Sequence, residues 1–525
     1  MTLTRLLARR HRLMLICWPL LLVALCCTLP AYQNTYTTPG QRRIAVESAQ
    51  HNAASTLLYG RLPDPGTPAQ MYAWEIGAFV TILAAVMAVL VAVAVTRAAE
   101  DDGSLELFRG CGISPAQPLR SALTILATMS VVLAAGCAAA ITVTAGGAEG
   151  VTGAGTAVFG AVTGLTFLVV ATGTVLLAQI VATAGHARLL GFTALGGAFA
   201  VRAFADTEHL DGLNRLSPLG LRAVAEPFTA DRWTALAPAA LAALLLAAAA
   251  MILSARREFG TGLVRRRDTR ATRLRIRTTA GLHARLTRSS LLVWTVAVAA
   301  IGALFATMGS GAVEQRRDGE VGGFLGAQLG AGDPTAGYLA YQGTLVGIVV
   351  SVFAILAVLD GRHAEDTGLT AQILATGVRR WAPTAARAAV TVAGGAVILT
   401  VTGVLTALVA PEFLAGDDIA VRGLAFTLGQ WPAVVALTGF ATLLAGAVPR
   451  FAVLAWLPLL AGGVTALLGD LLGIPGRVQD LGVFLHVPDV AAPDRPVAAL
   501  LVLVVAGVVS IVAGSIGAGR RDVRA

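Results

Sequence analysis

Twelve separate apolar runs are the feature that most constrains how this chain of 525 residues can fold. A helix needs about 20 mainly apolar residues to cross the roughly 30 Å hydrocarbon layer of a membrane. Measured against that length, the sequence predicts an all-α polytopic membrane protein with twelve transmembrane helices. The predicted spans are 13–31, 75–96, 121–145, 153–184, 189–205, 234–254, 289–308, 343–359, 388–410, 429–448, 451–473 and 497–518.

The charged residues exclude several other classes of protein. Only 13% of the residues are charged, about half the share of roughly 25% in soluble domains, which argues against a soluble enzyme. The 39 basic residues are all arginine. A phosphate-binding P-loop and Schiff-base catalysis both require lysine, so neither is possible here. The spacing of His, Cys, Asp, Glu and Ser shows no metal or catalytic constellation, and we expect no cofactor in this chain.

The distribution of arginine predicts how the chain crosses the membrane. With twelve spans both termini lie on one side, and that side carries about two thirds of the 39 arginines. Cytoplasmic loops collect basic residues, so we expect the N- and C-termini inside. Residues 256–288 hold 11 Arg against two acids, an excess equal to the net charge of +9. Because aromatic residues are not interleaved there, this strap indicates lipid headgroup contact, not nucleic acid, with Arg265, Arg266, Arg267 and Arg270 as the candidate contacts.

An internal repeat divides the chain into halves. The segment Arg97-Ala-Ala-Glu-Asp recurs 265 positions later as Arg362-His-Ala-Glu-Asp, and Arg256-Arg-Glu recurs 264 positions later as Arg520-Arg-Asp. Ordered matches at nearly constant spacing indicate a duplication. The sequence therefore predicts two parallel six-helix repeats, 1–255 and 289–525, joined by a basic cytoplasmic linker at 256–288.

Acidic residues open the same predicted cytoplasmic loop in both halves: Glu100 and Asp101, then Glu365 and Asp366. Each pair precedes a glycine and a short segment that mixes apolar and polar positions, which is the layout of a short interfacial helix. Anionic headgroups repel acids, so docking of a protein partner explains the duplicated acids better than headgroup contact does. An ordinary solvated loop is the alternative.

The predicted spans carry few ionisable groups. Glu75, Arg202, Asp360 and Asp470 all lie near span ends, where snorkelling or capping explains them. A proton- or sodium-coupled carrier usually needs acids near the middle of the membrane. None is predicted there, so the energy for any transport is expected to come from another polypeptide.

The order of several motifs resembles that of bacterial ABC exporter permeases of the polyketide-antibiotic (tetronasin-type) exporter family, in which two six-span units are fused. The resemblance covers essentially the whole chain. It rests on Tyr59-Gly60, Trp74 through Gly77, the two acidic loops, Ser217-Pro-Leu-Gly220, Pro227-Phe228, Asp231-Arg-Trp233, Arg256-Arg-Glu258 and Arg520-Arg-Asp522.

The resemblance implies the permease subunit of an ATP-driven exporter in a bacterial plasma membrane. ATP and Mg would be held by a separate ATP-binding subunit, present in two copies, and a hydrophobic or amphipathic, antibiotic-like compound would be moved outward. The permease itself would not be an enzyme. In the family the acidic loops form coupling helices that dock on the ATPase, and the corresponding residues here are Glu100, Asp101, Gly103, Glu106, Glu365, Asp366, Gly368 and Gln372.

This chain departs from the family pattern at Leu105, Thr370 and Ala371, where Arg or Glu is usual. The second coupling helix thus matches less well than the first. Two other classes remain open at this stage. An ion-coupled secondary drug carrier of twelve spans would need a buried acid, and a membrane scaffold or sensor would have no need of duplicated acidic loops.

Overall fold

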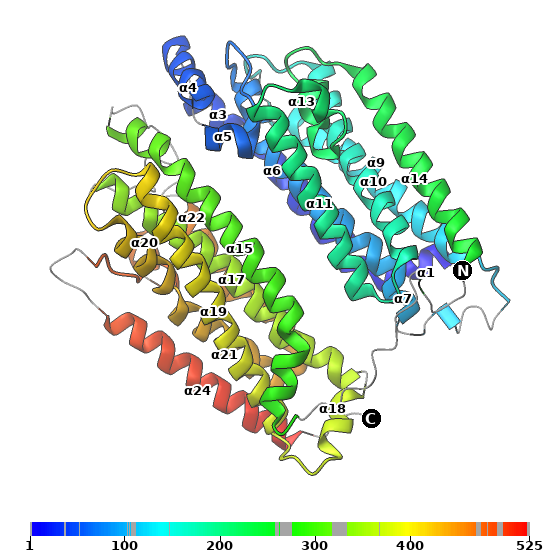
Figure 1. The fold of residues 1–525 in the computed structure, drawn as a ribbon, viewed down its shortest axis with the longest axis vertical. Coiled ribbons are helices and arrows are strands. Elements are labelled where there is room, and N and C mark those ends of the chain that lie inside the picture. Colours follow the sequence, from blue (N-terminus) through cyan, green and yellow to red (C-terminus); the bar gives the residue numbers. More distant parts are fainter. Residues whose placement is uncertain are drawn as a thin grey trace. The chain divides into compact units, whose positions relative to one another are not determined.

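The chain divides into two compact units, Met1–Thr272 and Arg273–Ala525, in the computed structural model. The boundary between them falls inside the predicted linker 256–288. Every regular element of the described residues is a helix (Figure 1). The structure describes residues 3–35, 38–51, 53–101, 103, 105–106, 112–145, 147–257, 262, 276–317, 333–366, 368–468, 474–479, 481–490 and 497–521.

The first unit contains six long membrane segments and several short helices that connect them. Its α-helices are α1 (Leu3–Arg10), α2 (Arg12–Leu25), α3 (Leu29–Thr35), α4 (Pro39–His51), α5 (Ala53–Tyr59), α6 (Pro68–Val95), α7 (Arg97–Asp101), α9 (Gln117–Thr144), α10 (Gly153–Ile180), α11 (Ala184–Thr207), α12 (Asp211–Asn214), α13 (Leu221–Ala225) and α14 (Leu236–Arg256). Short 3-10 turns lie at Cys26–Thr28, Pro218–Gly220 and Trp233–Ala235.

The second unit follows the same order of long helices. Its α-helices are α15 (Thr279–Arg317), α17 (Pro334–Asp366), α18 (Leu369–Leu374), α19 (Ala382–Phe413), α20 (Ile419–Leu428), α21 (Trp431–Ala447), α22 (Trp456–Leu468), α23 (Gly476–Gln479) and α24 (Ala498–Arg520). A 3-10 helix at Pro449–Ala455 leads directly into α22.

The predicted polytopic membrane fold is confirmed. Among the described residues, eleven helical segments are long and apolar enough to cross a membrane, and a bent pair at the N-terminus makes twelve. That pair, Leu3–Arg10 and Arg12–Thr28, is bent by 68°. The predicted spans 153–184 and 189–205 leave residues 185–188 as a turn, whereas those residues lie in α11 and the turn is at Val181–Thr183. In the second unit Val448 alone separates α21 from the 3-10 helix, close to the predicted break at residues 449–450.

Several helices extend beyond the predicted spans. The second predicted span begins at residue 75, whereas α6 begins at Pro68, after Thr67 and Gln70 cap each other's backbone N–H groups. Hydropathy detects only the part of a helix that matches hydrocarbon. The polar first turns of α6 are helical because capping and proline at the first position favour a helix start there.

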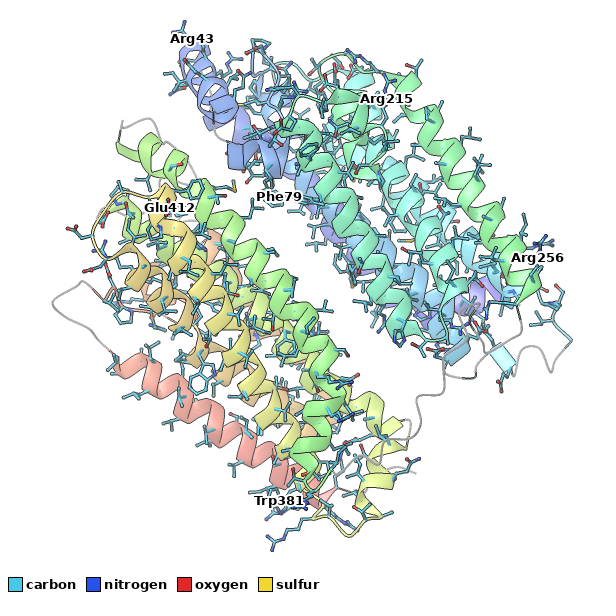
Figure 2. All side chains as sticks on the ribbon, viewed as in Figure 1. Arg43, Phe79, Arg215, Arg256, Trp381 and Glu412 are labelled. Carbon is cyan, nitrogen blue, oxygen red and sulfur yellow. The ribbon has the colours of Figure 1, made fainter. Side chains whose placement is uncertain are left out.

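Long apolar helices form the body of each unit, and their outer faces are apolar as well. In α24, Leu501, Val502, Val505, Val509 and Val512 are all more than half exposed. Charged side chains lie near helix ends, such as Arg256 at the end of α14 and Glu412 near the end of α19 (Figure 2). An apolar outer surface between polar ends is the surface that a bilayer requires, and we therefore describe the protein as membrane-embedded.

Helices α21 and α24 pack closely because glycines face each other along their contact. A Cβ atom at Gly446 would overlap the carbonyl oxygen of Gly514, and one at Gly439 would overlap that of Gly507. Small residues at such spacing allow two helix backbones to approach in lipid, where no hydrophobic force drives helices together.

We expect Gly446→Leu to push α21 away from α24 and to lower the free energy of unfolding by about 1–3 kcal/mol, as overpacking does. Thermal unfolding of the purified chain in detergent, followed by tryptophan fluorescence, measures the change. Gly196→Leu is the matched control, because Gly196 lies in α11 with no atom within 4 Å of its Cβ position. Equal melting temperatures for the two variants would contradict this account of the helix contact.

Candidate functional site

The first predicted docking acid, Glu100, lies in α7, the short helix that follows α6. Thr96 interrupts the helix with φ −121° and ψ −91°, and α7 then places Arg97, Ala99 and Glu100 on its buried face. The Glu100 side chain is only 3% exposed. Its carboxylate therefore faces the interior of the first unit, and it is not a surface charge.

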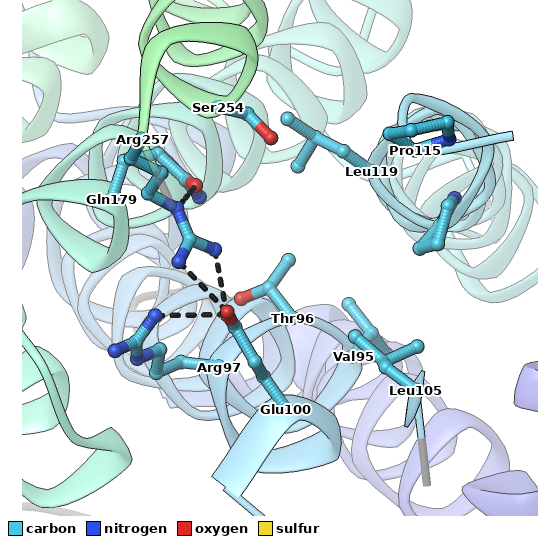
Figure 3. Close-up of a pocket in the computed structure, with 11 residues that line it drawn as sticks. Val95, Thr96, Arg97, Glu100, Leu105, Pro115, Leu119, Gln179, Ser254 and Arg257 are labelled. Atoms are coloured by element: carbon cyan, nitrogen blue, oxygen red, sulfur yellow. Dashed lines mark hydrogen bonds and ion pairs between the residues drawn. The ribbon is translucent and has the colours of Figure 1, made fainter. Parts of the chain in front are cut away.

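Two arginines hold the Glu100 carboxylate in place (Figure 3). Arg257 donates from Nη1 to Oε1 at 2.7 Å and from Nη2 to Oε2 at 2.6 Å, which is a bidentate pair. Arg97 donates from Nη1 to Oε2 at 2.8 Å. Charge-assisted, bidentate pairs of this kind fix geometry as well as charge. We call Arg97, Glu100 and Arg257 the first Arg–Glu–Arg cluster.

This first cluster ties four segments of the unit together. Arg257 lies just past the end of α14, and its Nε donates to Gln179 Oε1 near the end of α10 at 2.8 Å. Arg97 Nε donates to the carbonyl of Ala182, between α10 and α11, at 3.1 Å. The first cluster thus connects α7 to the ends of α10 and α14 and to the turn before α11.

Asp101 adds a second connection to the same turn. Its Oδ2 accepts from the backbone N–H of Ala184 at 2.6 Å, at the first residue of α11. A carboxylate at a helix N-terminus satisfies an unpaired donor and interacts favourably with the helix dipole. Asp101 also lies 3.7 Å from Arg97 Nε, and its side chain is 34% exposed. It can therefore contribute both to the cluster and to the surface.

The second unit repeats part of this arrangement: Glu365 pairs with Arg521, and Arg362 lies three residues before Glu365 without an ion pair to it among the described contacts. We call Arg362, Glu365 and Arg521 the second cluster. Arg521 lies just past the end of α24, as Arg257 does for α14, and its Nη2 donates to Glu365 Oε2 at 2.6 Å. Arg362 donates to the carbonyl of Pro449, between α21 and α22, as Arg97 does to that of Ala182. The two clusters thus share the acid, the arginine after the last helix and the carbonyl of the hairpin turn.

Each cluster borders a small cavity, and the two cavities are lined by corresponding residues. The cavity of about 70 Å³ in the first unit includes Leu105 and Pro118. The cavity of about 40 Å³ in the second includes Thr370 and Pro383, each 265 positions later. These lining positions match at the same offset of 265 as the sequence motif around Arg97 and Arg362.

The glycine after each acidic pair has a conformation that other residues rarely adopt. Gly103 has φ +73° and Gly368 has φ +74°, and neither has an atom within 4 Å of its Cβ position. Glycine is required at these positions for the backbone turn and not for space. The turn leads into residues 105–106 in the first unit and into α18 in the second.

Two of the other predicted coupling residues, Glu106 and Gln372, follow these glycines and are exposed. Ile373, the next residue of α18, is buried. Asp366 is the last residue of α17. The four arginines predicted to contact headgroups, Arg265, Arg266, Arg267 and Arg270, lie outside the described residues.

The two clusters differ in burial. The Glu365 side chain is 25% exposed, against 3% for Glu100. In the second unit Asp360 forms an additional pair with Arg387 at 3.4 Å, and the corresponding positions in the first unit are Val95 and Ala122. The first cluster therefore depends more on its internal ion pairs than the second does.

Sequence reasoning did not identify the arginine partners as part of the site. Arg97, Arg257, Arg362 and Arg521 were used only as landmarks of the repeat. Their recurrence at the ends of corresponding spans was the available signal, because a cation kept beside an acid in both halves indicates a pair.

The fold defines a polytopic, α-helical membrane protein with a side-chain cluster that recurs in two units, and comparison with known proteins identifies its family. Residues 276–518 match the family described as the C-terminal domain of the multidrug efflux system permease Rv1217c. The chain is also 32% identical to the multidrug efflux system permease protein Rv1217c of Mycobacterium tuberculosis, over 99% of this chain and 95% of that protein.

The chain belongs to the family of multidrug efflux permeases. This assignment makes it a membrane transport protein, and it agrees with the absence of catalytic motifs from the sequence. The part of the resemblance that concerns permeases is confirmed, whereas the tetronasin-type assignment and the ATP-driven mechanism are proposals, which are considered next.

Proposed function

We propose that this chain is the permease subunit of an ABC exporter that moves a hydrophobic or amphipathic, drug-like compound out of a bacterial cell. Two copies of a separate ATP-binding subunit hold ATP and Mg and dock on the two acidic segments. The permease then contributes the pathway across the membrane and hydrolyses nothing itself.

One observation carries this proposal: in each unit a glutamate pairs with the arginine that follows the last long helix, directly behind an exposed segment. Glu106 in the first unit and Gln372 in the second lie on the surface, and Glu100 and Glu365 lie behind them. Two corresponding surface segments suit a partner present in two copies. Each cluster connects its segment to helices that cross the membrane, so a push from the partner reaches the transport pathway.

The proposed orientation places both clusters and both termini on the cytoplasmic side of the plasma membrane. The support comes from the arginine distribution, since the predicted loops at this end of the helices carry most of the 39 arginines. The exposed segments then face the compartment that contains ATP. Because the chain contains no lysine, the P-loop that binds ATP must belong to the partner.

An ion-coupled secondary carrier is the second candidate, because the structure contains a buried acid that sequence reasoning did not place. Asp206 in α11 is 2% exposed. However, it pairs with Arg202 at 3.2 Å, only one residue before the end of α11. A carrier usually needs an acid near the middle of the membrane, whereas this carboxylate lies at a helix end, where it is held by Arg202 and by the amide of Asn214.

Inside-out membrane vesicles distinguish the two candidates. In vesicles that contain the chain and its ATP-binding subunit, we expect ATP to drive dye accumulation, and an ionophore that collapses the proton and sodium gradients should leave it intact. Vesicles whose ATP-binding subunit carries a P-loop Lys→Ala substitution are the control and should accumulate none. Accumulation that persists in this control but stops with ionophore would overturn the proposal in favour of the carrier.

A further inference from the structure

A large polar cavity lies at the end of the first unit opposite to the first Arg–Glu–Arg cluster. Its volume is about 760 Å³, within the range of about 300–1,000 Å³ that drug-sized ligands occupy. Its walls come from the beginning of α6, the end of α11, the short helices α12 and α13 and the loops between them. Apolar side chains, including Leu62, Trp74 and Val224, alternate with charged ones.

A buried group of charged and polar residues lies at the inner wall of this cavity: Asp206, Asn214 and Arg222 line it, and Arg202 lies behind Asp206. Arg202 Nε lies 3.2 Å from Asp206 Oδ2, and both side chains are at most 3% exposed. Asn214, which is 2% exposed, donates from Nδ2 to Asp206 Oδ1 at 2.7 Å, while its Oδ1 has no hydrogen-bond partner. The sequence places Arg202 at a span end. Of the two predicted roles, snorkelling and capping, the structure favours capping, because the guanidinium is held inside by Asp206 and by the carbonyls of Leu57 and Leu58 in the last turn of α5.

Arg222 brings a second cation to the same group. It donates to the carbonyls of Ala73, at 3.1 Å, and of Tyr59. Burial, and then the neighbouring Arg202, lower the pKa of Arg222 to about 10, while Asp206 opposes the shift. Among the described residues, Asp206 is the one acid in the interactions of either guanidinium. The group thus carries two positive charges and one negative charge.

The rim of the cavity does not supply the missing negative charge. Two of its acids have partners of their own, since Asp211 pairs with Arg61 and Glu226 pairs with Arg232 at 3.1 Å. Asp64 also lines the cavity, but its side chain is exposed and it forms no ion pair with Arg202 or Arg222. A buried charge without a counter-charge is costly, and a ligand that supplies one is stabilised correspondingly. An anionic group on the ligand would balance the excess positive charge of Arg202 and Arg222. The apolar part of the ligand would then contact the walls around Trp74.

We propose that this cavity binds an amphipathic molecule through a carboxylate or phosphate group, with Arg222 as the principal anion contact and Trp74 and Leu62 against the apolar part. Two helices connect the cavity to the first Arg–Glu–Arg cluster. Helix α6 runs about 30 Å from Trp74 to the segment before Arg97, and α11 runs from Ala184, bonded to Asp101, to Asp206. The ligand is the exported compound only if the proposed export function is correct, so this part of the inference rests on that proposal.

Binding of a fluorescent fatty acid tests the proposal without the ATP-binding subunit. The probe is 11-(dansylamino)undecanoic acid, and its methyl ester is the uncharged counterpart. The full chain is placed in phosphatidylcholine nanodiscs, with empty nanodiscs as the blank. We expect the acid to bind at least about tenfold more tightly than the ester, the difference that one charge-assisted hydrogen bond provides.

Arg222→Gln should weaken binding of the acid about tenfold and leave binding of the ester within twofold. Arg215→Gln is the matched control, because it removes the same charge from an exposed residue of the cavity rim. If Arg222→Gln does not fold, Ala223→Glu replaces it. That variant adds a carboxylate beside Arg222 on the cavity wall, and it should also weaken binding of the acid about tenfold.

Equal affinity of the unmodified chain for the acid and the ester would overturn the proposal, as would equal effects of Arg222→Gln and Arg215→Gln. Nanodiscs with phosphatidylglycerol then separate two sources of the anion. If phosphatidylglycerol competes with the probe, the natural ligand of the site is an acidic lipid. If binding of the probe is undiminished, the natural ligand is an anionic compound that is not a membrane lipid. Because no ATP is used, these results do not depend on whether export is ATP-driven.

Discussion

Replacing Glu100 by Gln is expected to lower the free energy of unfolding by about 3–5 kcal/mol, the usual cost of removing one partner of a buried ion pair. The variant keeps the shape of the side chain but leaves the guanidinium groups of Arg97 and Arg257 without their shared counter-charge. We also expect drug export by this variant to fall, because α7 would no longer be fixed to α14.

Glu365→Gln is the matched control, because it removes the corresponding acid from the second cluster. That side chain is 25% exposed and has one strong ion pair, so we expect a loss of about 1 kcal/mol. Chemical unfolding of the purified variants in detergent measures both values. The double variant Glu100→Gln with Arg257→Gln should cost less than the sum of the single variants. Equal losses for Glu100→Gln and Glu365→Gln would contradict the described difference in burial.

The second large effect is expected at the other end of α11, where Asp206→Ala should also cost about 3–5 kcal/mol. The substitution leaves Arg202 and Arg222 buried beside each other with no acid, and it removes the acceptor for Asn214. Repulsion between the two cations adds to the cost of burying them.

Asp211→Ala provides the comparison for Asp206→Ala. Asp211 also pairs with an arginine, Arg61, but its side chain is 77% exposed, so solvent screens the pair and we expect a change of at most about 1 kcal/mol. Melting temperatures in detergent distinguish the two. A large loss for Asp211→Ala, or none for Asp206→Ala, would show that the buried group is not what stabilises this end of the unit.

The membrane fold could be predicted because the hydrocarbon layer imposes one length and one polarity on every span. The positions of the spans follow from hydropathy alone. Hydropathy does not predict where helices such as α6 begin. Gln70 and Glu75 are polar, and their helical conformation depends on capping and on contacts with neighbouring residues. Glu75 accepts a hydrogen bond from Tyr32, 43 positions away.

The candidate site was only partly predictable. The repeat identified the segments that contain Glu100 and Glu365, but not the burial of Glu100, because its partner Arg257 lies 157 positions away. No spacing rule connects residues at such a separation. The pair Arg202 and Asp206 is different, since four positions along a helix place the two side chains side by side. The spacing of Arg202 and Asp206 therefore indicates this pair from the sequence alone.

Contact between the exposed segments and the ATP-binding subunit is the central claim, and site-specific photo-cross-linking tests it most directly. Benzoylphenylalanine is placed at Glu106 or at Gln372 in a chain co-expressed with the ATP-binding subunit, and at Glu149 as a control. Glu149 is 63% exposed and lies between α9 and α10, at the opposite end of the first unit. We predict a cross-linked product with the ATP-binding subunit at Glu106 and at Gln372 and none at Glu149. No product at Glu106 and Gln372, in membranes that still export drug, would contradict the account.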